Sequence, residues 1–146
     1  MTRMQDQKRK TLPPDIKRFV EYKLENIKEI EMQLAEYRKS LMPSSVPSYS
    51  GMSGGNSGES RPAENVAVKL TTDQFIVESE KTIRIIRAVT DNCDPIDKKI
   101  ITLCYWKKSH NKEGAALVCH LSKSAVYDRI NNILFRIALD LGYVNL

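Results

Sequence analysis

The amino-acid sequence predicts an all-helical fold, and three features of the chain support this class. Apolar residues recur every three or four positions through most of the 146 residues, which is the spacing that gathers side chains on one face of an α-helix. Residues that favour helix starts, such as Asp94 followed by Pro95, stand directly before several of these segments. No segment alternates apolar and polar residues over the length of a β-strand.

The first expected helix follows Pro13 and Pro14 and continues to residue 42. Its apolar residues form one narrow stripe opposite a charged face. They are Ile16, Val20, Leu24, Ile27, Ile30, Leu34, Tyr37 and Leu41. A single helix of about thirty residues cannot bury such a stripe by itself. It therefore needs a partner, which is a second copy, the rest of this chain, or another protein.

Residues 43–60 are rich in Ser and Gly and hold almost nothing that can be buried, which is typical of a flexible linker. The sequence thus predicts three parts. Residues 1–42 form an amphipathic helix for oligomerisation or partner contact, residues 43–60 form the linker, and residues 61–146 form a helical domain.

Two helices are expected directly after the linker. Ser60 caps the first, which has Pro62 in its first turn and ends near Leu70. Thr71 and Gln74 have the spacing of a capping box and open the second, which ends near Asn92. Its apolar stripe consists of Phe75, Ile76, Ile83, Ile86 and Val89.

Three shorter helices follow from three capping residues. Asp94 opens a helix that ends near Trp106 and buries one side, made of Ile96, Ile100, Leu103 and Cys104. Asn111 opens a helix with Ala115, Ala116 and Val118 inside. Ser122 opens the last helix. The stripe expected to be buried there consists of Val126, Ile130, Ile133, Leu134 and Ile137.

Residues 110–137 have the pattern of a helix-turn-helix: a short helix with small central residues, a tight turn at His120 and Leu121, and a capped second helix. The second helix of such a motif enters the DNA major groove with its first turns leading. The residues there that lie off the core stripe are candidates for base contact: Lys123, Ser124, Tyr127 and Asp128, with Asn131 one turn further. Candidates for phosphate contact are Arg129, Lys112, Lys107 and Lys108.

The charge distribution agrees with a polyanionic partner. The net charge is +5, and residues 95–146 hold eight basic against four acidic residues. No nucleophile motif or phosphate-binding loop is present, so we expect no enzyme, no catalytic residue and no cofactor. Cys104, His110, Cys119 and His120 match no common zinc spacing, so no metal is expected either. Tyr105 and Trp106 are expected in the core.

Several of these residues also resemble a known family. Residues 94–143 resemble the fourth conserved region of bacterial sigma factors, and nearly the whole chain resembles phage late-transcription activators of the RinA and ArpU type. The matching features are the Pro13-Pro14 helix start, the Ser-Gly linker, Pro62-Ala63-Glu64, Tyr105-Trp106 and the run from Ser122 to Tyr127. The resemblance implies a sigma-region-four-like helix-turn-helix in which Lys123, Ser124, Tyr127 and Asp128 read promoter bases.

The expected function is therefore a sequence-specific DNA-binding transcription regulator that activates late phage genes for packaging and structural proteins. Its expected partners are double-stranded DNA, host RNA polymerase and a second copy in a homodimer. Its expected location is the bacterial cytoplasm, at the nucleoid, with no membrane contact. Two alternatives stay open: a phage small terminase subunit that recognises a packaging site, and a helical interaction protein that does not bind DNA.

Overall fold

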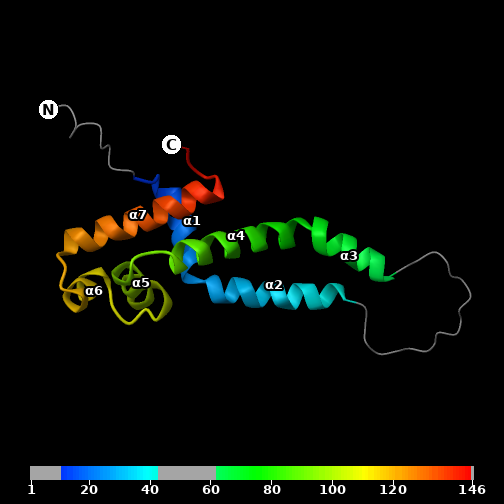
Figure 1. Ribbon diagram of the computed structural model, residues 1–146, viewed down its shortest axis with the longest axis horizontal. Helices are drawn as coiled ribbons and strands as arrows, with labels where there is room; N and C mark the ends of the chain where they lie inside the picture. The colour runs from blue at the N-terminus through cyan, green and yellow to red at the C-terminus, as the bar shows by residue number, and fades with distance from the viewer. Residues whose placement is uncertain (1–10, 43–61, 146) are drawn as a thin grey trace, which may run out of the picture. The chain divides into compact units, whose positions relative to one another are not determined.

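The computed structural model describes residues 11–42 and 62–145 (Figure 1). Every regular element in these two ranges is helical, which confirms the all-α class. The expected linker at 43–60 and its Ser60 cap lie outside the described residues. The elements are α1 (Pro14–Glu25), α2 (Ile27–Leu41), α3 (Pro62–Thr72), α4 (Gln74–Asp91), α5 (Pro95–Ile101), a π-helical turn η3 (Thr102–Trp106), α6 (Lys112–Cys119) and α7 (Lys123–Leu141).

The described residues form two compact units. The larger unit contains those up to Ile27 and those from Thr82 onward, and the smaller unit contains those between Lys28 and Lys81. This division differs from the expected parts 1–42 and 61–146, because the first helix packs with the C-terminal helices. Helix α4 begins in the smaller unit and ends in the larger one.

The front segment is not the single helix that the apolar stripe predicts. Helix α1 ends at Asn26, whose φ of −105° and ψ of 23° leave the helical region, and α2 begins at the next residue. The Asn26 side-chain amide donates a hydrogen bond to the Tyr22 carbonyl at 2.8 Å. Asn side chains compete in this way with the helical backbone pattern, which accounts for the break.

Helix α1 belongs to the core of the larger unit. Val20 and Leu24 are fully buried in one cluster with the apolar face of α7. Two hydrogen bonds fix the helix there: the Trp106 indole donates to the Leu24 carbonyl at 3.1 Å, and the Tyr105 hydroxyl donates to Glu21 at 2.8 Å. For this part of the front stripe, the partner is therefore the rest of the same chain.

The cap of α4 differs from the expected capping box. The Asp73 carboxylate accepts from the backbone N–H groups of Phe75 at 2.9 Å and Ile76 at 3.3 Å. The Thr71 hydroxyl instead donates back to carbonyls of its own helix α3. A carboxylate satisfies the free amides of a first turn more strongly than a hydroxyl does, so α4 begins after Asp73.

Asp73 also joins two helices of the smaller unit. Its carboxylate accepts a hydrogen bond from the Tyr37 hydroxyl of α2 at 2.7 Å. The Tyr37 ring packs edge-on against the Phe75 ring, with 4.8 Å between the ring centroids. Among the described residues of this unit, Leu34 and Ile76 are buried apolar side chains. The hydrogen bond from Tyr37 lowers the pKa of Asp73 and raises the pKa of the Tyr37 phenol.

Replacing Tyr37 by phenylalanine is expected to raise the pKa of Asp73 toward its ordinary value, because the largest cause of its lowering is lost. The folded-state pKa of Asp73 is lowered, so the pair stabilises the fold above the ordinary carboxyl pKa. That contribution disappears as the pH falls through the folded-state pKa. NMR titration of the Asp73 carboxyl measures the change. Tyr22→Phe, at an exposed ring of α1, is the control, and an Asp73 pKa unchanged in Tyr37→Phe would contradict the assignment.

Helix α5 begins as predicted, with the Asp94 carboxylate accepting from the Ile96 N–H at 3.0 Å. Its buried side agrees with the prediction only in part. Ile100 and Tyr105 are buried as expected, and Trp106 is partly buried against the core. Ile101 is buried as well, whereas Ile96 in the first turn is 38% exposed. The expected buried residues Leu103 and Cys104 are only partly covered. The π-helical turn accounts for the difference at Leu103 and Cys104, because its i to i+5 hydrogen bonds add a residue to the turn and rotate the register from Thr102 onward.

The last two helices begin directly after the predicted caps. Asn111 and Ser122 cap α6 and α7, and Gly142 ends α7 in the left-handed region at φ 86°. All five residues of the predicted stripe of α7 are buried: Val126, Ile130, Ile133, Leu134 and Ile137. Helix α1 lies across the C-terminal half of α7, and α6 contacts α7 near its start (Figure 1).

Candidate nucleic-acid interface

A tight turn joins α6 to α7. Helix α6 ends at Cys119, its C-cap residue His120 adopts the left-handed conformation at φ 56°, and Ser122 is extended before α7 begins. The Ser122 hydroxyl accepts from the Ala125 N–H at 3.0 Å, which fixes the first turn of α7. Ala115 and Ala116 are buried in α6, and small side chains at such positions let two helices approach closely. The sequence therefore specifies both the turn and the crossing locally.

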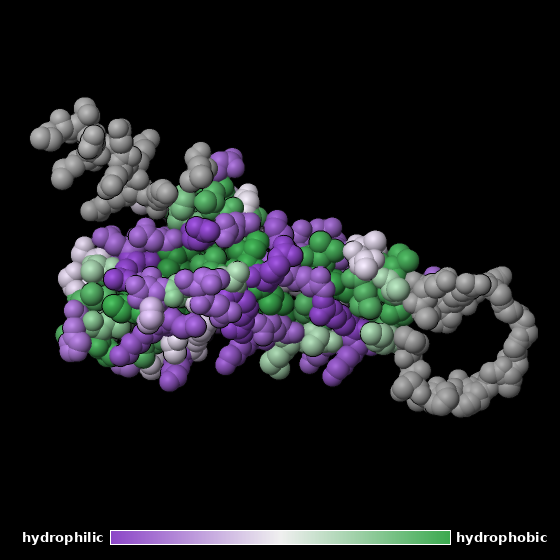
Figure 2. All heavy atoms as spheres, viewed as in Figure 1, coloured by the Kyte–Doolittle hydropathy of each residue, from purple (hydrophilic) through white to green (hydrophobic). Residues whose placement is uncertain are grey.

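The predicted base-contacting residues lie on the outer side of the first three turns of α7. Lys123, Ser124 and Asp128 are exposed, and Tyr127 and Asn131 are partly covered. The structure brings all five together on one helix face, away from the buried stripe. Figure 2 shows hydrophilic side chains along α7 on the face that it draws. This surface is thus open to a large partner.

Lys123 has an acidic partner on the neighbouring helix. Its ammonium lies 2.7 Å from the carboxylate of Glu113 in the first turn of α6. Both side chains are well exposed, at 57% and 63%. The hydrogen bond between them lowers the pKa of Glu113 and raises the pKa of Lys123. Sequence reasoning missed Glu113, which lies ten positions from Lys123 and meets it only after the turn.

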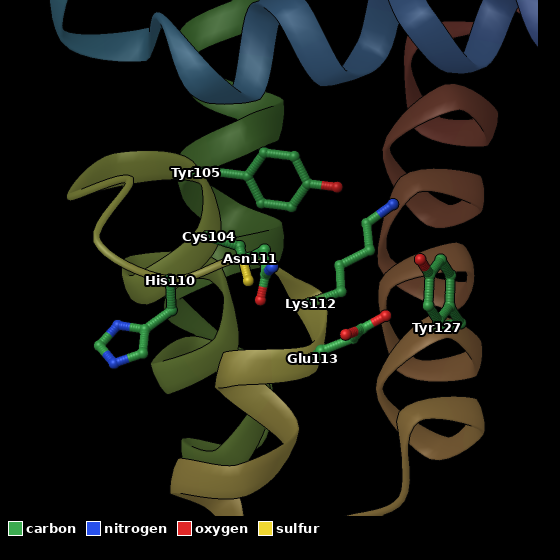
Figure 3. Close-up of a pocket in the computed structure, with 7 residues that line it drawn as sticks. All are labelled: Cys104, Tyr105, His110, Asn111, Lys112, Glu113 and Tyr127. Carbon is green, nitrogen blue, oxygen red and sulfur yellow. The ribbon is translucent and has the colours of Figure 1, made fainter.

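The Tyr127 ring lies beside two cations. The Lys112 ammonium is 4.7 Å from the ring centroid, and the Lys123 ammonium is 5.9 Å from it. Both distances suit a cation–π contact. Figure 3 shows Lys112 and Glu113 reaching from α6 toward Tyr127 on α7, whereas the His110 imidazole points away. These side chains border an open groove of about 280 Å³, which is also lined by Cys104, Tyr105, His110 and Asn111.

Two of the predicted phosphate contacts are engaged elsewhere in the larger unit. The Arg129 guanidinium donates to Asp97 of α5 at 2.9 Å, with 32% and 18% of the two side chains exposed. This hydrogen bond raises the pKa of Arg129. Lys108 lies 2.7 Å from Glu25 of α1. Arg129 and Lys108 therefore join elements within the fold. A phosphate can bind either side chain only if it displaces the carboxylate of Asp97 or Glu25.

Lys107 and Lys112 differ from these two in their surroundings. Lys107 is exposed after η3, and Lys112 lies over Tyr127 at the start of α6. Of the two, Lys112 is the one that contacts α7, through the Tyr127 ring. The positive surface of the motif is therefore smaller than the count of basic residues indicates, because Lys123, Arg129 and Lys108 each lie against an acid.

Two of the three cysteines lie in surroundings that disfavour a reactive thiolate. Burial is the main cause that raises the pKa of Cys93 and Cys104, which disfavours the nucleophilic thiolate. Within the described ranges, no group of three or more His, Cys, Asp or Glu side chains is arranged to hold a metal ion. None of the helices in these ranges has the length and apolar character needed to cross a membrane.

Comparison with known proteins identifies no relative: no protein-family model, no curated protein and no solved structure matches this chain.

Proposed function

We propose that this chain is a sequence-specific DNA-binding transcription regulator in which α7 enters the major groove of duplex DNA. The observation that supports this most is the exposed first part of α7, presented after a tight turn from α6 and capped by Ser122. An α-helix of this kind fits the width of the major groove. The resemblance of residues 94–143 to sigma region four suggests that the regulator activates late phage genes in the bacterial cytoplasm.

Each exposed residue at the start of α7 has a chemistry that suits a base edge. The Lys123 ammonium donates to O6 and N7 of guanine, and the Asp128 carboxylate accepts from the amino group of cytosine. Ser124 both donates and accepts. Tyr127 and Asn131 stand at the edge of the same face and extend the contact by one turn. Mixed donors and acceptors of this kind favour sequence choice over general attraction to phosphates.

Phosphate contacts fall first to Lys107 and Lys112. Lys107 is exposed, and Lys112 stands in the first turn of α6. Helix starts are suited to phosphate because free backbone N–H groups point outward there. Arg129 and Lys108 join these contacts only when a phosphate takes the place of Asp97 or Glu25. We therefore expect few phosphate contacts and modest affinity for a single copy.

Titration with duplex DNA at several salt concentrations tests the proposal. Each phosphate that the protein neutralises contributes about −0.9 to the slope of log affinity against log salt. We expect a slope of about −2 to −4, and a footprint on the genome segment that encodes the protein. Duplex binding that is absent at low salt, or that does not respond to salt, would overturn the proposal. A ring of many copies in solution would favour the terminase alternative.

A further inference from the structure

We propose that Glu113 is a specificity-determining residue of this interface: its carboxylate withholds Lys123 from DNA phosphates and so weakens binding to duplexes of unrelated sequence. The inference rests on the proposed DNA-binding function. Glu113 stands beside the recognition surface, and none of the proposed base contacts requires it.

The geometry places the carboxylate where a phosphate would otherwise bind. Glu113 projects from the first turn of α6 toward α7 (Figure 3), and its oxygen lies 2.7 Å from the Lys123 ammonium. With Lys112, these side chains lie around the Tyr127 ring. Two cations and one anion thus share a small area, and the anion is paired with the cation at the start of α7.

An exposed ion pair of this kind contributes little to stability, since water screens both charges. Its effect on a polyanion is larger. The Glu113 carboxylate lies 2.7 Å from the Lys123 ammonium. A phosphate that contacts the same ammonium therefore comes close to this carboxylate, and the two negative charges repel each other strongly in a partly dehydrated interface. Glu113 therefore lowers the benefit of a phosphate contact at Lys123.

A base contact is affected less. An ammonium has three N–H donors, so Lys123 can donate to guanine O6 or N7 while it still donates to Glu113. Binding to an unrelated sequence depends on phosphate contacts alone. The carboxylate thus weakens non-specific binding more than specific binding, and the ratio between the two affinities increases.

The test compares the full-length chain with Glu113→Gln on a random-sequence duplex over a range of salt concentrations. Glutamine keeps the shape of the side chain and removes the charge. We expect affinity for the random duplex to rise about three- to tenfold and the salt slope to become steeper by about one unit, as for one additional phosphate contact. Affinity for the footprinted site should rise less, so the specificity ratio falls.

The matched control is Asp140→Asn, which makes the same change in net charge and also releases a cation, Arg136, near the other end of α7. Adding Lys123→Gln to Glu113→Gln should return the slope to the wild-type value. Equal slopes for wild type and Glu113→Gln, or equal effects of Glu113→Gln and Asp140→Asn, would overturn the inference while leaving the proposed function intact. A wild-type chain that shows no salt-dependent binding would overturn both.

Discussion

Replacing both Lys123 and Tyr127 by alanine is expected to reduce affinity for the specific DNA site by about thirtyfold or more. Each well-placed base contact contributes about 1 to 3 kcal/mol, so the loss of two costs about 2 to 6 kcal/mol. The change also leaves the Glu113 carboxylate facing the duplex without the ammonium that now neutralises it. Fluorescence anisotropy with a labelled duplex measures the affinity, and far-UV circular dichroism measures the helix content.

The control for this variant is the double change Arg136→Ala and Asp140→Ala, which removes an exposed ion pair of the same helix. It should leave the affinity within about twofold of wild type, since surface pairs contribute little. If the Lys123 and Tyr127 double variant kept its helix content and its affinity for the footprinted site, α7 would not be the helix that reads the bases.

Replacing Leu24 by alanine is expected to destabilise the larger unit by about 2 to 5 kcal/mol, because a fully buried leucine leaves a cavity in a packed core. Leu24 lies in the same buried cluster as Leu134 and Ile137 of α7. The midpoint of urea unfolding, followed by circular dichroism, measures the loss. An effect of this size is a large fraction of the stability of an ordinary domain.

Arg18→Ala, at an exposed position of the same helix, is the control and should change the stability by about 0.5 kcal/mol or less. By the same reasoning, deletion of residues 1–42 should destabilise the remaining chain, because it uncovers the α7 surface against which α1 packs. Equal stability of wild type and Leu24→Ala would mean that α1 stands apart from the core, as a tethered helix would.

Local signals in the sequence predicted much of the fold correctly. The caps Asp94, Asn111 and Ser122 and the buried stripe of α7 could be recognised without a structure. Each depends on residues two to four positions apart, and such interactions form wherever the helix forms. The placement of the candidate base-contacting residues on one exposed face follows from the same periodicity.

The errors have local physical causes as well. Asn26 breaks the front helix, although its apolar stripe continues beyond that position. Asp73 caps α4 in place of the weaker box formed by Thr71 and Gln74. The π-helical turn after α5 rotates the register by one residue, so a strict 3.6-residue period predicts Ile100 correctly but wrongly buries Leu103 and Cys104.

The sequence by itself determined the helical class, the starts of the last two helices and the outward face of α7, because these depend on neighbours within one or two helical turns. Only the tertiary structure decided that α1 completes the core and that Glu113, Asp97 and Glu25 lie against Lys123, Arg129 and Lys108. Charged side chains that are far apart in the chain meet only after helices have packed, so their pairing has no periodic signal along the sequence.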